Sequence, residues 1–175
     1  AATSSGGASA VIVTSASSAR RAKQRPVIIR GMGESHTHRS ITNMPDLARS
    51  GGADAAARAF AQAQWSPASV DVAMIYDAFT TLVPRSLCEA GIVAPGDVAR
   101  LLADDTASAG INPNGGQLGC GHTGVAAGMS LITGAVRQHA GTAGPVQIAR
   151  AERAFVSATG GEMSTNAALV LEAGS

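Results

Sequence analysis

Short apolar runs alternate along this chain with alanine-rich segments of helical spacing, and this alternation constrains the fold more than any other feature. The runs are bounded by Gly, Pro, Asn or charged residues, as strands usually are. Between them, apolar residues recur every three or four positions, which indicates helices. Strands that alternate with helices predict an α/β fold with helices layered on a central sheet. The predicted strands are 8–15, 26–31, 70–75, 146–150, 154–158 and 167–171.

The predicted helices fill the spaces between these strands. Asp54 is the expected N-cap of an alanine-rich helix that ends at Ala63. Residues 33–52 carry polar and turn residues and are predicted to form a long surface loop, and residues 110–124 are predicted to form a glycine-rich turn. The other helices are expected to begin within 16–20 and to span 79–87, 95–102 and 124–139.

Composition excludes several classes of protein. Hydrophobic residues make up 45% of the chain, charged residues 14%, and the formal net charge is +1. A chain this apolar and weakly charged is globular and not disordered, and it is not expected to bind nucleic acid. No apolar stretch approaches the roughly 20 residues of a membrane span. Cys88 and Cys120 lie far apart and predict neither a disulfide framework nor a zinc site, so a cytoplasmic setting is expected.

Histidines supply the first candidates for chemistry. His36 and His38 are spaced to share one face of an extended segment, but no third metal ligand is near them, so no metal site is predicted. His122 stands between glycines just before a predicted helix, whose free N–H groups favour negative charge. There it is suited to act as a base or a hydrogen-bond donor. The alternative is a buried histidine satisfied by backbone groups.

Four short motifs resemble the signatures of the thiolase superfamily. They are YDAF at 76–79, NPNGG at 112–116, GHTG at 121–124 and ATGG at 158–161. Thiolases carry Asn-Glu-Ala-Phe or His-Asp-Cys-Phe, Asn-x-x-Gly-Gly, Gly-His-Pro-x-Gly and Cys-x-Gly-Gly in these places. The long gap between the first and third motifs is most similar to the sterol-carrier and lipid-transfer branch. The resemblance covers the C-terminal half of a thiolase fold.

That resemblance implies a layered αβα fold with a mixed five-stranded sheet. Residues 25–175 would be the C-terminal half, and residues 1–24 the tail of an N-terminal half. The rest of the N-terminal half would come from the same protein or from a separate chain and would complete the site. Because thiolases usually form dimers, the resemblance also implies a homodimer.

The resemblance assigns roles to particular residues. His122 would face an acyl-CoA, where it would polarise the thioester oxygen or activate a nucleophile. The backbone N–H of Gly160 would line a second oxyanion site. Asn112, Gly121 and Gly161 would lie at the substrate. No cofactor is implied beyond the coenzyme A thioester that serves as substrate.

Departures from the thiolase pattern favour different chemistry. Ala158 stands where thiolases have an acid/base cysteine, and alanine cannot transfer a proton. Thr123 replaces the usual proline. Tyr76, the only tyrosine of the chain, occupies the position that holds a catalytic water in the family, and its phenol can exchange a proton with a substrate hydroxyl. Some members similar to lipid-transfer proteins are aldolases. They cleave β-hydroxyacyl-CoA side chains of steroids together with an OB-fold, zinc-ribbon partner.

We therefore expect the chain to belong to an enzyme that makes or breaks a carbon–carbon bond beside a thioester. Retro-aldol cleavage by Tyr76, His122 and the Gly160 N–H is the preferred hypothesis. One alternative is a degenerate thiolase or acyltransferase that relies on His122 and a nucleophilic cysteine of the other half. Another is a non-catalytic subunit that binds acyl-CoA or scaffolds a partner enzyme. The alternative for Tyr76 is a structural role, as a core residue whose hydroxyl has a hydrogen-bond partner within the protein.

Overall fold

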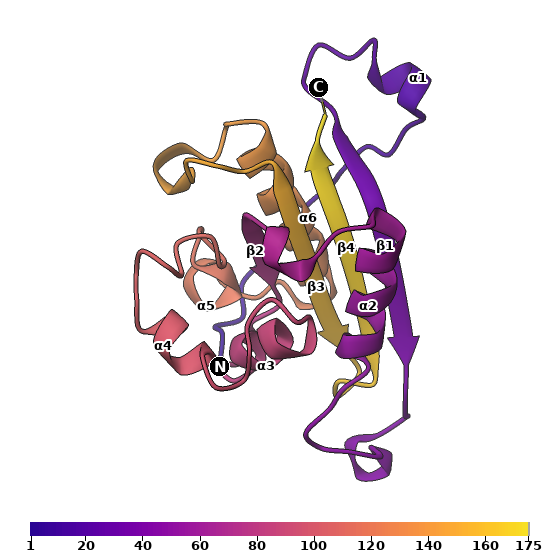
Figure 1. Cartoon of the computed structure of the whole chain (residues 1–175), viewed down its shortest axis with the longest axis vertical. Helices are drawn as coiled ribbons and strands as arrows, with labels where there is room; N and C mark the ends of the chain where they lie inside the picture. Colours follow the sequence, from indigo (N-terminus) through magenta and orange to yellow (C-terminus); the bar gives the residue numbers. More distant parts are fainter. Residues whose placement is uncertain (175) are drawn as a thin grey trace.

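A mixed sheet organises the molecule, with helices on both of its faces (Figure 1). The computed structural model describes residues 1–174. Strand β4 runs antiparallel to both of its neighbours, and β2 runs parallel to β3. The α/β class and the layered αβα arrangement are confirmed, but the sheet has four strands and not five. In spatial order these are β1 (Val27–His36), β4 (Thr165–Ala173), β3 (Arg153–Gly160) and β2 (Val72–Ile75).

Helices connect the strands and cover the sheet. Helix α2 contacts β1 and β4, whereas α6 contacts β2 and β3. No helix within residues 1–174 is both long and apolar enough to cross a membrane. The α-helices are α1 (Ala16–Ala19), α2 (Gly52–Ala63), α3 (Leu82–Glu89), α4 (Val98–Leu102), α5 (Gly116–Cys120) and α6 (Ala127–His139). The 3₁₀ turns are η1 (Ile41–Asn43), η2 (Pro67–Ser69), η3 (Gly124–Ala126) and η4 (Gly144–Val146).

Two hydrophobic cores form because successive strand residues point to opposite faces of the sheet. On one face, Ile75 and Phe155 lie in a cluster with α2 and α3, and the ring of Phe60 stacks on that of Phe155 at 5.3 Å. On the other face, Met74 and Val156 lie in a cluster with α6. All four residues of β2 are buried. Both cores therefore fix β2, and with it the start of the turn that follows.

Two predicted strands are absent from the described residues. Within 8–15, Ile12 and Val13 are 95% and 76% exposed. Within 146–150, η4 takes the first residue, and the backbone N–H of Gln147 donates to the Gly144 carbonyl at 3.1 Å, within the 3₁₀ turn. An apolar run becomes a strand only where a neighbouring backbone pairs its N–H and C=O groups. Neither run has such a neighbour within residues 1–174.

The loop and turn predictions were only partly right. Strand β1 continues through His36, because its pairing with β4 extends as far as Thr165, so the first part of the predicted loop 33–52 is strand. The predicted turn 110–124 contains the short helix α5. Both errors arose from glycines. In a sequence pattern glycines indicate turns and loops, but this fold places them inside β1 and α5.

The predicted N-cap of α2 was wrong. Gly51 occupies the cap position, and Asp54 lies in the first turn of the helix. There the Asp54 carboxylate pairs with the Arg49 guanidinium at 3.1 Å. An acidic residue in the first turn still complements the positive end of the helix dipole, so the same residue type marks the helix start from a different position.

Candidate active site

Tyr76 and His122, two of the predicted catalytic residues, are in direct contact. The distance from Tyr76 Oη to His122 Nε2 is 2.7 Å, and the two rings meet edge to face with centroids 5.5 Å apart. Tyr76 directly follows β2, and its backbone N–H donates to the Ser157 carbonyl of β3. His122 follows α5. The fold thus brings together two turns that are far apart in the sequence.

The hydrogen bonds of His122 decide which ring nitrogen carries the proton. The backbone N–H of Gly124 donates to His122 Nδ1 at 3.1 Å. A nitrogen that accepts a hydrogen bond carries no proton, so in the neutral ring the proton lies on Nε2. Nε2–H then donates to Tyr76 Oη. The hydroxyl hydrogen of Tyr76 is left free to reach a ligand.

Tyr76 itself is a protonated phenol at neutral pH. Partial burial raises the pKa of Tyr76 above its ordinary value, and the nearby negative charge of Asp77 raises it further. Both effects disfavour the phenolate. The N–H of His122 opposes them, because a hydrogen bond donated to the phenol oxygen is strongest when that oxygen is charged.

Asp77 and Gln117 form a buried pair, here called the Asp77–Gln117 latch. The Asp77 carboxylate accepts the backbone N–H groups of Gln117 at 2.7 Å and of Leu118 at 3.3 Å. In return, Gln117 Oε1 accepts the backbone N–H of Asp77 at 3.1 Å. Gln117 Nε2 donates to the Ala127 carbonyl at the start of α6. The latch therefore ties the end of β2 to α5 and α6, on either side of His122.

The latch explains the second glycine of the NPNGG motif. Gly116 has φ +60°, and a Cβ atom there would overlap the Asp77 carboxylate. Only glycine allows this backbone conformation and this close approach together. Sequence reasoning missed the role of Asp77. The available signal was an acidic residue next to Tyr76 combined with paired glycines before a short helix.

Asn112 directs its side chain toward β2. Its Oδ1 accepts the backbone N–H of Ile75 at 2.7 Å, and its Nδ2 donates to the Ile75 carbonyl at 2.9 Å. The amide thus pairs with the last residue of β2 as a neighbouring strand would. In this structure Asn112 helps to position Tyr76, which follows Ile75. Its predicted contact with substrate stays a prediction.

Gly160 and Gly161 lie at a different turn, the hairpin between β3 and β4. Gly161, Glu162 and Met163 all have positive φ, so this hairpin turn is tightly wound. A Cβ atom at Gly160 would meet nothing within 4 Å. Within residues 1–174, no hydrogen bond joins Gly160 to Tyr76 or His122. The predicted oxyanion and substrate contacts of these glycines stay predictions.

Ala158, by contrast, lies on the same apolar cluster as Tyr76. Ala158 and Tyr76 both pack against the apolar cluster that includes Met74 and Leu131. A thiolase would carry its acid/base cysteine at position 158, by the resemblance described above. Here a methyl group takes that place, and Tyr76 packs on the same cluster.

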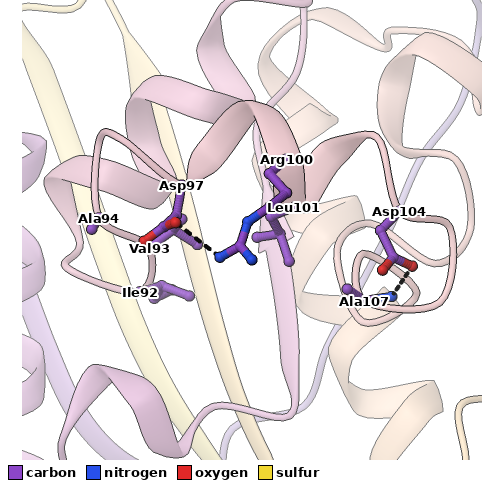
Figure 2. Close-up of a pocket in the computed structure, with 8 residues that line it drawn as sticks. All are labelled: Ile92, Val93, Ala94, Asp97, Arg100, Leu101, Asp104 and Ala107. Carbon is purple, nitrogen blue, oxygen red and sulfur yellow. Dashed lines mark hydrogen bonds and ion pairs between the residues drawn. The ribbon is translucent and has the colours of Figure 1, made fainter.

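The pocket drawn in Figure 2 has a volume of about 410 Å³ and lies apart from this pair. Arg100 crosses it and is paired with Asp97 at 2.9 Å, and the Asp104 carboxylate accepts the backbone N–H of Ala107. Neither Tyr76 nor His122 lines this pocket. Its charged groups already have partners, so it does not compete with the Tyr76–His122 pair as the candidate site.

Comparisons with known proteins identify a family for most of the chain. Residues 33–173 match the family model described as thiolase C-terminal domain-like. The 17-hydroxy-3-oxo-4-pregnene-20-carboxyl-CoA lyase of Mycobacterium tuberculosis is 34% identical over 138 residues, which is 71% of this chain and 34% of that protein. The steroid side-chain-cleaving aldolase of Thermomonospora curvata is 32% identical over 111 residues, or 59% of this chain and 27% of that protein.

A solved structure extends the similarity to most of the chain. The structure named Ltp2-ChsH2(DUF35) aldolase matches with a TM-score of 0.75 and 26% identity, covering 90% of this chain and 42% of that one. The chain spans about a third or less of the length of the two curated relatives. The similarity therefore concerns one part of each of these proteins.

Proposed function

Because this chain belongs to the thiolase C-terminal domain-like family, we propose that it forms the C-terminal part of an enzyme that cleaves a β-hydroxyacyl-CoA by a retro-aldol reaction. The observation that carries this proposal is the contact of Tyr76 Oη with His122 Nε2 at 2.7 Å. The names of two relatives, a carboxyl-CoA lyase and a side-chain-cleaving aldolase, support it. Ala158 argues against thiolysis, since a methyl group transfers no proton.

The reaction requires two proton transfers and one bond cleavage. A base removes the proton of the β-hydroxyl, and the Cα–Cβ bond breaks as the β-carbon becomes a carbonyl. The electron pair moves onto the thioester as an enolate, which is then protonated at Cα. The products are a ketone or aldehyde and a shortened acyl-CoA.

In this proposal Tyr76 exchanges the proton of the β-hydroxyl. In the cleavage direction its phenolate accepts that proton, and in the condensation direction its phenol returns it. The phenolate is scarce because burial and Asp77 raise the pKa of Tyr76. His122 offsets this by donating Nε2–H to the charged oxygen. His122 thus acts as a hydrogen-bond donor, and not as the base considered from the sequence.

Other components complete the proposed site. The backbone N–H of Gly160 holds the enolate oxygen, and Gly121, Gly161 and Asn112 shape the substrate side. An N-terminal thiolase half and a second copy of the enzyme cover the surfaces that this chain leaves exposed. An OB-fold, zinc-ribbon subunit is proposed as a further partner, since the similar solved structure names two components, Ltp2 and ChsH2(DUF35). The enzyme is proposed to work in the cytoplasm on a steroid or other lipid side chain.

The test is turnover of a β-hydroxyacyl-CoA by the protein purified with every chain that copurifies. A steroid side-chain thioester with a tertiary β-hydroxyl is the substrate, and the ketone and the shortened acyl-CoA are measured by liquid chromatography with mass spectrometry. Tyr76→Phe is expected to lower kcat at least about 100-fold, because the proton carrier is lost. His122→Ala is expected to shift the rise of kcat/KM with pH to more alkaline values.

Matched controls separate chemistry from folding. His36→Ala removes an exposed histidine at the end of β1, whose ring contacts the Thr165 side chain, and is expected to leave kcat unchanged. Thiolysis of a 3-oxoacyl-CoA by free coenzyme A is measured in parallel. Cleavage that survives both Tyr76→Phe and His122→Ala would refute the assignment, and thiolysis without aldol cleavage would favour the degenerate thiolase.

A further inference from the structure

Residues 2–5 run alongside the two turns that carry Tyr76 and His122, and they are here called the N-terminal clasp. The backbone N–H of Ala2 donates to the Ala78 carbonyl at 2.8 Å. The N–H of His122 donates to the Thr3 carbonyl at 2.8 Å, and the N–H of Ser5 donates to the His122 carbonyl at 3.0 Å. The clasp therefore pairs with His122 as a short parallel bridge and reaches the Tyr76 turn at its other end.

The side chains of the clasp fit the same turn closely. A Cβ atom at Gly121 would lie 2.6 Å from Ser5 Oγ and 2.8 Å from Ser5 Cβ, so glycine at 121 lets the clasp lie directly against the chain before His122. Just beyond the clasp, a Cβ atom at Gly7 would lie 2.7 Å from Thr123 Cγ2. The closeness of these contacts on either side of His122 indicates a fitted pairing and not a loose tail.

The clasp satisfies both backbone groups of His122. The N–H and C=O of this residue are held by Thr3 and Ser5, while Gly124 N–H holds Nδ1 of its ring. With the backbone fixed on both sides, the imidazole keeps Nε2–H directed at Tyr76 Oη. Without the clasp, the turn 121–123 loses two backbone hydrogen bonds at the point where its glycine gives the chain most freedom.

We propose that residues 2–5 are a positioning element of the active site, which holds His122 on Tyr76 and joins the Tyr76 turn to the His122 turn through Ala78. The expected effect of the clasp on kcat rests on the proposed retro-aldol function. Its effect on the position of His122 does not depend on that function. The clasp acts through backbone hydrogen bonds. Its side chains need not touch the reacting atoms.

A proline pair tests the clasp. Ser5→Pro removes the N–H that donates to the His122 carbonyl, whereas Ser9→Pro makes the same chemical change at an N–H without a hydrogen-bond partner within residues 1–174. In the protein purified with its copurifying chains, Ser5→Pro is expected to lower kcat about 10-fold or more with little change in KM. Its pH–rate profile should also shift to more alkaline values, as expected for His122→Ala. Ser9→Pro is expected to change neither, and Ser5→Ala, which keeps the N–H, is expected to recover what Ser5→Pro loses.

Hydrogen–deuterium exchange measured by mass spectrometry gives a readout that needs no activity. Ser5→Pro is expected to speed exchange in the peptide that contains residues 121–123, relative to wild type and Ser9→Pro. If exchange and kcat both stay at wild-type values in Ser5→Pro, or if exchange rises while kcat holds, the positioning role is refuted. If the wild-type enzyme cleaves no β-hydroxyacyl-CoA, the proposed function fails, and unchanged exchange in Ser5→Pro still refutes the clasp.

Discussion

Two turns at the ends of strands carry candidate site residues, and they differ sharply in how they are held. The turn at Tyr76 and Asp77 is bound to Gln117, to His122 and, through Ile75, to Asn112. At the hairpin turn 160–164, Gly160 pairs with Thr165, but a Cβ atom added at Gly160 would meet nothing within 4 Å. The first turn is built by groups within this chain. The second is also held by this chain, but mainly through exposed contacts: the Glu162 carboxylate accepts the backbone N–H of Ile41 at 2.8 Å, and the Ser164 carbonyl accepts that of Thr37 at 3.0 Å.

Matched glycine substitutions test this contrast, and they carry the largest expected effect on stability. Gly116→Ala combines a left-handed backbone with overlap of the buried Asp77 carboxylate and should cost about 3 kcal/mol. In Gly161→Ala the added Cβ overlaps only Ser164 Oγ, which can rotate away. This variant should lose about 1 kcal/mol more stability than the backbone strain alone would cost. Gly141→Ala has a similar φ and an open Cβ position, so it isolates that strain.

Urea unfolding of the three variants gives the comparison directly. The expected order of destabilisation is Gly116→Ala, then Gly161→Ala, then Gly141→Ala. Equal losses at Gly116 and Gly141 would mean that backbone strain accounts for the whole effect. The Asp77 carboxylate would then have no part in requiring glycine at 116.

Asp77→Asn is expected to cost less, about 1–2 kcal/mol, since one acceptor oxygen remains and the amide leaves a buried N–H donor without a suitable partner. Asp105→Asn makes the same change at an exposed carboxylate and serves as the control. Thermal unfolding of both variants gives the difference. A loss of stability in Asp105→Asn as large as in Asp77→Asn would show that charge removal, and not the latch, is responsible.

The smallest expected effect is an alkaline loss of stability at the first turn. The pKa of Tyr76 is raised above 10.0 in the folded state, so folding favours the phenol. The resulting contribution of Tyr76 to the free energy of unfolding is fully present below pH 10.0. It is lost as the pH rises from 10.0 through the higher pKa of the folded state. The Tyr76→Phe variant has no phenol to ionise at this position. Its melting temperature should therefore fall less than that of the wild type between pH 9 and pH 11. Equal losses in the two proteins would contradict the raised pKa.

Sequence reasoning predicted the parts of the site that depend on residue type. The motifs around Tyr76 and His122 identified both side chains, and the fold placed them in contact. The alternation of apolar runs was enough for the α/β class and for most helices, because it reflects which face of each element is buried.

Other parts could not be predicted because they depend on partners distant in the sequence. The run 8–15 has the composition of a strand, but composition does not reveal whether a neighbouring strand exists, and here Ile12 and Val13 stay exposed. Asp77 and Asn112 were assigned no structural role from the sequence, because their hydrogen bonds reach 40 and 37 residues along the chain.

The pairing of β1 with β4 sets the order in which this chain can fold during translation. Val27 pairs with Ala173, so the first strand of the sheet waits for the last one to be synthesised. At roughly 5–20 residues per second, that interval is on the order of ten seconds. Through it, α2 can already pack against β1, but the backbone edge of β1 that pairs with β4 has no partner. Nascent chains of this protein are therefore expected to need a chaperone near the ribosome, and slower synthesis of the last strand should lower the soluble yield.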